Sequence, residues 1–233
     1  MLKRLKSFFS SGDQNPKVVD IVSIHIPKTA GLSFREILFK VYGKDGVYAK
    51  NRGELQKEGI TIEGSIPKSI RVFHGHLHYA ELKGIIGPES RIITWFREPV
   101  KRVISNYYYN ITHEFPKRKL ENPDLKKFSL EEFIEKPNRQ NVMSQFLEGI
   151  SLEKIFFLGF QEDFNSDLGI LARKLSWEDE NWKKNERLND NSKVRDSAPE
   201  TSQEIIDRIK EVNQKDIELY HRALALKSKG HWK

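Results

Sequence analysis

Short apolar runs alternate with stretches of helical periodicity along most of this chain. The runs predict buried strands at residues 19–25, 71–74, 91–96 and 154–159. Apolar positions that recur at helical spacing predict helices at residues 33–42, from Pro99 onward, and at 130–134, 140–147, 164–175 and 197–225. The charged stretch 112–128 holds two prolines and is expected to be an excursion. Strands that alternate with helices favour an α/β fold, with a P-loop-like parallel sheet flanked by helices.

The composition and charge of the chain limit the classes of protein to which it can belong. We expect a flexible basic N-terminal tail at residues 1–17, then a single domain at residues 18–233. No run approaches the roughly 20 apolar residues of a membrane span, so no span is expected. The chain has no cysteine, which excludes disulfides and thiolate metal sites and fits a cytoplasmic location. The net charge of +7 favours a polyanionic ligand: nucleic acid, acidic glycan, anionic lipid or a phosphate-rich cofactor.

Two candidate phosphate-binding loops each follow a predicted strand and open a helix. They are residues 24–34, IHIPKTAGLSF, and residues 95–108, WFREPVKRVISNYY. A strand–loop–helix unit places backbone N–H groups and the positive end of the helix dipole against an anion. Two such loops suggest a nucleotide that carries phosphate at both ends.

The first loop has the residues that anion binding requires. Gly31 allows close backbone approach, Ser33 can add a hydroxyl donor, and Lys28 supplies a mobile positive charge. The lysine comes three residues before the glycine, whereas a Walker A motif has it directly after the second glycine. This spacing weighs against a magnesium-dependent ATPase or GTPase.

Residues 27–34 resemble the 5′-phosphosulfate loop of sulfotransferases. The most similar branch is that of the carbohydrate enzymes, the heparan sulfate 2-O-sulfotransferase-like group and its bacterial relatives. Segments 138–141, 147–149, 157–164, 188–192 and 216–220 are also similar to that branch. The resemblance implies a sulfotransferase fold and the donor 3′-phosphoadenosine 5′-phosphosulfate (PAPS). It assigns the 5′-phosphate to Lys28, Thr29, Ala30, Gly31, Leu32, Ser33 and Phe34. Leu32 stands where the family usually has threonine, so a hydroxyl is lost while the backbone N–H remains.

The second loop matches the family's 3′-phosphate site, in which a serine follows an arginine by eight residues. The resemblance therefore assigns the 3′-phosphate to Arg97 and Ser105. Arginine can fork onto two phosphate oxygens, which would select PAPS over ATP. Nearby, we expect Arg102 to be a solvated helix charge, and Glu98 to cap the helix start or pair with a basic neighbour.

Residues 73–79, FHGHLHY, contain three alternating histidines. No acidic or sulfur ligand lies nearby in sequence, so a metal site is disfavoured. A neutral histidine suits a general base near pH 7. The HGH pattern resembles the segment with the catalytic histidine of the 2-O-sulfotransferase group. That implies His76 as the base and His74 as a supporting or acceptor-binding residue. His78 is expected at the surface, and His25 is expected to be structural.

These assignments predict in-line transfer of a sulfuryl group from PAPS to a hydroxyl, without a metal. Lys28 would neutralise charge on the leaving 5′-phosphate oxygen. A carbohydrate acceptor rests on the resemblance. Basic clusters at 117–119, 126–127 and 183–184 would hold an acidic glycan, although charge runs are usually solvated. The tyrosines at 107–109 offer rings for stacking, with at least one expected inside. Lys193 and Arg195 are weak candidates for covering the nucleotide.

Three other readings stay open at the level of sequence. A P-loop small-molecule kinase would need ATP preference and a magnesium site. A basic nucleic-acid-binding module would bind with a steep dependence on salt. A sulfotransferase-like fold that binds a nucleotide without catalysis is disfavoured by the presence of Lys28, His76, Arg97 and Ser105.

Overall fold

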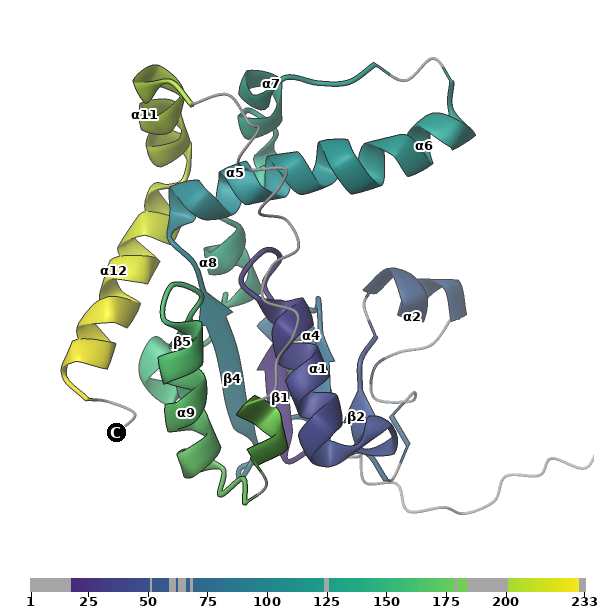
Figure 1. Ribbon diagram of the computed structural model, residues 1–233, viewed down its shortest axis with the longest axis vertical. Coiled ribbons are helices and arrows are strands. Elements are labelled where there is room, and N and C mark those ends of the chain that lie inside the picture. Colours follow the sequence, from purple (N-terminus) through teal and green to yellow (C-terminus); the bar gives the residue numbers. More distant parts are fainter. Residues whose placement is uncertain are drawn as a thin grey trace, which may run out of the picture.

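Five parallel strands form the centre of the fold, in the order β2-β3-β1-β4-β5 (Figure 1). The structure, a computed structural model, describes residues 18–50, 52–58, 62, 66–67, 69–123, 126–178, 180–183 and 201–230. The strands are Ile21–Ile24 (β1), Val47–Tyr48 (β2), Val72–Gly75 (β3), Arg91–Phe96 (β4) and Phe157–Phe160 (β5). The predicted α/β class is confirmed, with a parallel sheet flanked by helices.

Helices surround the sheet, and α1 and α9 lie in front of it in Figure 1. The α-helices are Gly31–Tyr42 (α1), Arg52–Glu58 (α2), Tyr79–Leu82 (α4), Pro99–Tyr109 (α5), Phe115–Glu121 (α6), Leu130–Ile134 (α7), Val142–Phe146 (α8), Phe164–Lys174 (α9), Gln203–Val212 (α11) and Gln214–Ser228 (α12). Short 3-10 turns occupy Lys44–Gly46, Lys83–Ile85, Pro137–Arg139, Leu152–Lys154 and Glu180–Lys183, and a π-helix, η3, occupies Asn110–Glu114. None of the helices described is long and apolar enough to cross a membrane.

The order of the strands creates a crevice at the carboxyl ends of β1 and β4. The two strands are neighbours, but the chain leaves β1 toward β2 at one edge and leaves β4 toward β5 at the other. In parallel α/β sheets, such a switch point is where ligands bind. Both candidate phosphate loops begin here, at Ile24 and Phe96.

The helix after β4 begins as predicted and continues further than predicted. Pro99 lies in its first turn, and the Glu98 carboxylate accepts hydrogen bonds from the amides of Val100 and Lys101 at 3.0 and 2.8 Å. The segment 112–128, expected as an excursion, instead continues this helix through η3 into α6, as Figure 1 shows. Pro116 does not end it, and lies directly after the π-helical turn of η3.

The single long C-terminal helix expected at residues 197–225 is two helices. The break falls at Asn213, whose φ is −122° and whose amide accepts from the Asn141 N–H at 2.8 Å. Two predicted regions, the N-terminal tail and the loop at residues 188–195, lie outside the described residues, as does Lys184.

Arg102 is a buried residue, which contradicts the expectation of a solvated charge. Its side chain is 0% exposed, and its Nε lies 3.9 Å from Oδ2 of Asp216, which is also 0% exposed. The Asp216 carboxylate also accepts from the amides of Met143 and Ser144, at 3.0 and 2.8 Å. This buried seam, defined by Arg102, Asp216, Met143 and Ser144, joins α5 and α12 to α8.

Candidate active site

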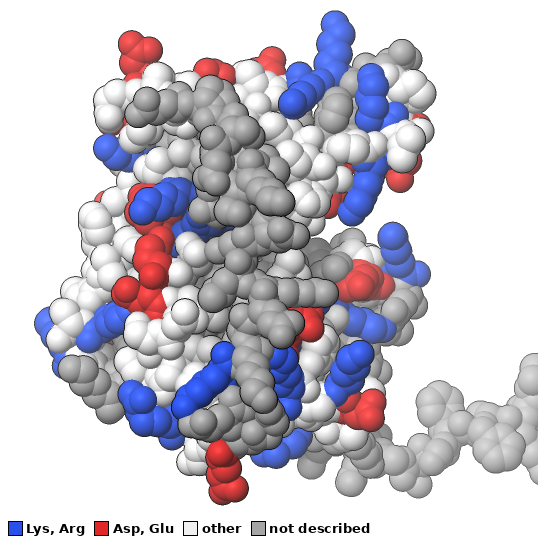
Figure 2. Space-filling model, viewed as in Figure 1, with Lys and Arg blue, Asp and Glu red and all other residues white. Residues whose placement is uncertain are grey.

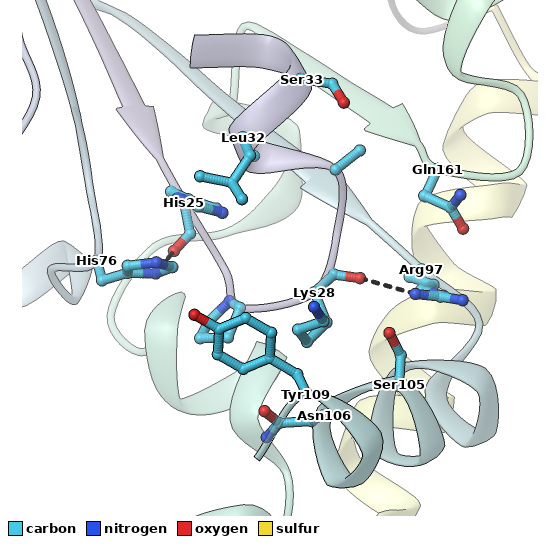
Figure 3. Close-up of a pocket in the computed structure, with 13 residues that line it drawn as sticks. His25, Lys28, Leu32, Ser33, His76, Arg97, Ser105, Asn106, Tyr109 and Gln161 are labelled. Atoms are coloured by element: carbon cyan, nitrogen blue, oxygen red, sulfur yellow. Dashed lines mark hydrogen bonds between the residues drawn. The ribbon is translucent and has the colours of Figure 1, made fainter. Parts of the chain in front are cut away.

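One pocket collects residues from both candidate phosphate loops and from the histidine segment (Figure 3). Four residues predicted from distant parts of the chain meet there: Lys28, His76, Arg97 and Ser105. In the close-up, His76 and Arg97 lie on opposite sides, with Lys28 between them. The pocket is lined by His25, Pro27, Lys28, Ala30, Gly31, Leu32, Ser33, His76, Arg97, Ser105, Asn106, Tyr109 and Gln161.

The first loop has an unusual backbone for residues with side chains. Lys28 and Ala30 both have left-handed conformations, with φ of 73° and 72°. Left-handed residues alternating with right-handed ones turn successive amides inward and form anion-binding concavities. The Thr29 hydroxyl donates to the Ile26 carbonyl at 2.9 Å, and this hydrogen bond stabilises the turn. The loop is therefore shaped before any ligand binds.

The first turn of α1 completes the anion-facing surface. Amides in the first turn of a helix have no acceptor within the helix. The residue before it, Ala30, has no side chain that could cap them. The Leu32 side chain is 59% exposed at the pocket wall. Phe34 is different: it is 0% exposed and its amide donates to the Ala30 carbonyl at 3.0 Å, so it belongs to the core.

The His25 ring lies so close to residue 31 that only glycine fits there, and the sequence did not indicate this contact. A Cβ atom at this position would lie 1.7 Å from Nε2 of His25. No side chain fits there unless the helix or the His25 ring moves. The close approach that glycine permits at this position is therefore to His25.

Arg97 connects the two loops. It is 5% exposed, and its Nη1 donates to the Lys28 carbonyl at 3.2 Å. Ser105, two turns along α5, is 9% exposed and lines the same pocket. The geometry thus brings the predicted arginine–serine pair to one side of the pocket, beside the lysine loop.

His76 presents a defined ring nitrogen to the pocket. Its Nδ1 lies 2.7 Å from the His25 carbonyl oxygen. A carbonyl oxygen only accepts, so Nδ1 of His76 carries the proton and Nε2 of the neutral ring is the acceptor. Burial lowers the pKa of His76 below its ordinary value of 6.5, the hydrogen bond to His25 opposes this, and Arg35 adds to it. His76 is therefore neutral at pH 7.

The other histidines of the segment lie elsewhere. His74 is 3% exposed, does not line the pocket, and has its Nδ1 2.9 Å from the Ser23 hydroxyl. This is a supporting position and not one that an acceptor can reach. Burial, followed by the charge of His76, lowers the pKa of His74 to about 3. His78 is half-buried against Phe146, with ring centroids 4.5 Å apart. Among the described residues, no three His, Asp or Glu side chains are grouped to hold a metal ion.

Sequence reasoning did not assign three of the lining residues, His25, Asn106 and Gln161, to the site, and it named Tyr109 only as one of three possible stacking rings. Tyr109 lies one helical turn after Ser105, so its position on the same face of the helix could have been predicted from the spacing. Its ring centroid is 4.2 Å from Nζ of Lys28. Gln161 follows the carboxyl end of β5, as Arg97 follows that of β4. Of the other two tyrosines, Tyr107 packs in a second core cluster between α5 and α7.

The electrostatic character of the pocket is one-sided. Lys28 and Arg97 both contribute positive charge to its wall, and none of the described lining residues is Asp or Glu. A pocket with such a lining has a positive potential that favours an anion.

No protein-family model matches the sequence, and no curated protein sequence is significantly similar to it. Two solved structures are similar in shape. One is a mouse sulfotransferase, SULT7A1, complexed with PAP, at 14% identity and a TM-score of 0.43. That match covers 84% of this chain and 66% of the mouse chain, so this chain spans just under two thirds of the mouse protein's length. The other is a sulfotransferase from Alicyclobacillus acidocaldarius, at 14% identity, a TM-score of 0.47, and coverage of 89% and 95%. Likenesses this weak establish no activity for this chain.

Proposed function

We propose that this chain is a PAPS-dependent sulfotransferase that moves a sulfuryl group to a hydroxyl of a carbohydrate acceptor. The observation that carries the proposal is the meeting of two positive loop residues, Lys28 and Arg97, in a pocket whose described lining has no carboxylate and whose far side holds a neutral histidine. A nucleotide with phosphate at both ends fits the first feature. A reaction that removes a proton from a hydroxyl fits the second.

In the proposed reaction, the acceptor oxygen forms a bond to sulfur while the bond from sulfur to the 5′-phosphate oxygen breaks. Nε2 of His76 takes the hydroxyl proton. Lys28 and the amides of the first turn of α1 stabilise the negative charge that develops on the leaving phosphate. Arg97 and Ser105 hold the 3′-phosphate. The products are a sulfate ester and adenosine 3′,5′-bisphosphate, and atoms and charge balance without a metal.

The carbohydrate acceptor is supported by two features, one in the pocket and one further along on α6. The half-buried Tyr109 ring can pack against a sugar ring. Lys117, Arg118 and Lys119 are exposed on α6, in the region where Figure 2 shows a group of basic side chains. Such charges suit an acidic glycan, and they lie about 12–15 Å along the helix from Tyr109.

The proposal is tested by calorimetric titration with adenosine 3′,5′-bisphosphate and with ATP, both without magnesium. We expect the bisphosphate to bind and ATP to bind much more weakly. Arg97→Ala should weaken bisphosphate binding by roughly 10- to 100-fold, the worth of a charge-assisted hydrogen bond. Arg91→Ala is the matched control, because Arg91 is an exposed arginine at the opposite end of the same strand.

Two outcomes would overturn the proposal. One is the absence of bisphosphate binding to the wild-type protein. The other is preferred binding of ATP in the presence of magnesium, which would favour the small-molecule kinase. Binding of nucleic acid with a steep salt dependence, and of neither nucleotide, would favour a basic nucleic-acid-binding module.

A further inference from the structure

We propose that the His25 ring is a positioning residue, a neutral spacer packed between the ring of His76 and Gly31 of the first phosphate loop, residues 24–34, which we call the donor loop. In this role it fixes the distance between the loop that holds the leaving group and the base that takes the proton. The inference rests on the proposed sulfotransferase function, and it gives His25 a task that the sequence did not suggest.

The spacer role follows first from a stack of three imidazole rings at the carboxyl ends of β1 and β3. The centroids of His25 and His76 are 3.9 Å apart, with 27° between the ring planes. On its other side, the His25 ring lies 4.8 Å from His74 at 23°. His74 is in turn held at Ser23 and is 3% exposed. The stack therefore has an inner end in the core, His74, and an outer end that lines the pocket, His76.

The donor loop also packs directly against the His25 ring. Nε2 of His25 approaches Gly31 so closely that a single added carbon would overlap it. Gly31 is the first residue of α1, whose first-turn amides face the proposed 5′-phosphate. A larger side chain at His25 would therefore overlap this first turn or His76, and a smaller one would leave a gap between them.

The backbone and the ring of His25 act on His76 in separable ways. The His25 carbonyl fixes the tautomer of His76 through the 2.7 Å contact to Nδ1. The ring controls where the imidazole plane lies (Figure 3). A side-chain substitution keeps the carbonyl, so it tests the ring alone.

The spacer stays uncharged while the base works. Burial holds the pKa of His25 well below 6.5, and the charges of His76, His74, Arg35 and Lys28 depress it further. These are the basic groups that face the ring from β3, the turn after β3, α1 and the donor loop. Space filling, and not charge or proton transfer, is what the ring contributes.

The experiment compares His25→Ala, which leaves a gap, with His25→Leu, which fills most of it without ring nitrogens. Leu38→Ala is the matched control, because Leu38 is a fully buried residue of α1 away from the pocket. Three quantities are measured: kcat and KM for PAPS, affinity for adenosine 3′,5′-bisphosphate, and the titration of His76 by NMR of its imidazole nitrogens.

We expect His25→Ala to lower kcat by about 10²-fold, the scale of an ångström-sized misplacement. The bisphosphate affinity should stay within about threefold, since Lys28, Arg97 and Ser105 remain. Water in the gap should raise the pKa of His76 toward 6.5. His25→Leu should recover most of the rate, and Leu38→Ala should lower the melting temperature without moving the His76 titration.

Two results would overturn the spacer role. One is a His25→Ala protein with wild-type kcat and an unchanged His76 titration. The other is a His25→Leu protein as slow as His25→Ala, which would assign direct chemistry to the ring nitrogens. Failure of the proposed function looks different: the wild-type protein would bind no bisphosphate and transfer no sulfuryl group. The NMR titration needs neither ligand, and it would then decide alone whether the ring shapes the environment of His76.

Discussion

The pocket and the buried seam between α5 and α12 each contain a buried arginine, but the surroundings of the two arginines differ. Arg97 and Arg102 are only five residues apart, and both are almost wholly buried. Arg102 faces the Asp216 carboxylate within the protein. Arg97 faces a pocket whose described lining has no carboxylate. The seam contains the carboxylate that Arg102 faces, whereas under the proposed function the anion at Arg97 would be a phosphate of the donor.

This contrast shows that burial of an arginine does not by itself reveal its task. Taking a guanidinium out of water is costly, and a buried partner offsets the cost inside the seam. Burial lowers the pKa of Arg102, and Asp216 acts in the opposite direction. In the pocket, the offset would come from the donor phosphates. Substitutions in the pocket should therefore change the reaction rate or ligand binding, whereas substitutions in the seam should change the stability of the fold.

The largest expected effect is on the pocket side. His76→Ala should lower the rate of sulfuryl transfer by about 10²–10⁴-fold, because it removes the proposed general base. Binding of adenosine 3′,5′-bisphosphate and the free energy of unfolding should change little, since His76 lies at the pocket wall. Steady-state assays with PAPS and calorimetry measure the two quantities. His78→Ala is the control, because His78 packs on Phe146 and does not line the pocket. Full activity in His76→Ala would end the base assignment.

The seam should show the reverse behaviour. Asp216→Ala should lower the free energy of unfolding by about 3–5 kcal/mol, because it leaves Arg102 buried without its carboxylate. Bisphosphate affinity per folded molecule should be unchanged. Chemical denaturation and calorimetry check these expectations.

Glu135→Ala is the matched control for the seam. Glu135 pairs with Arg208 at 2.7 Å, but the two side chains are 51% and 42% exposed. Because solvent screens such an exposed pair, its loss should lower the free energy of unfolding far less than the loss of Asp216 does. If the two variants were equally stable, or if Asp216→Ala lost bisphosphate affinity, the division between seam and pocket would be wrong.

The strands of the sheet could be predicted wherever the sequence has a long apolar run. Residues 21–24, 72–75, 91–96 and 157–160 lie within or next to the apolar runs, and they form strands because buried parallel strands read as continuous apolar sequence. β2 gave no such pattern, because it has only two residues. The phosphate loops were predictable because their glycine, lysine and arginine follow strand ends.

What the sequence could not supply were contacts between distant segments. Arg102 looked solvated because its partner, Asp216, lies on another helix near the C-terminus. His25 looked structural because the rings that stack on it come from β3 and the turn after it. The continuation of α5 through η3 was hidden by the charge of that stretch. There the Asn110 side chain donates to the Asn106 carbonyl at 2.8 Å and supports the widened turn.

The smallest expected effect is a loss of folding stability at acidic pH. His74 has a folded-state pKa of about 3, against an ordinary value of 6.5. Between these values the unfolded chain binds a proton that the folded chain does not, so stability falls as pH drops below 6.5. One such group contributes a slope of up to about 1.4 kcal/mol per pH unit. Above pH 6.5 both states are neutral at this residue, and it adds no pH dependence.

The slope of unfolding free energy against pH, measured by denaturation between pH 4.5 and 6.5, isolates this contribution. His74→Asn should reduce the slope by about 1.4 kcal/mol per pH unit, whatever it does to stability at pH 7. His25 and His76 stay in place, and their lowered pKa values leave part of the slope. His221→Asn is the control, because His221 is exposed in the folded chain as in the unfolded one. An unchanged slope in His74→Asn would mean that the inner end of the histidine stack takes up its proton in the folded state. The histidine stack beside the pocket would then add a positive charge, at acidic pH, to those of Lys28 and Arg97.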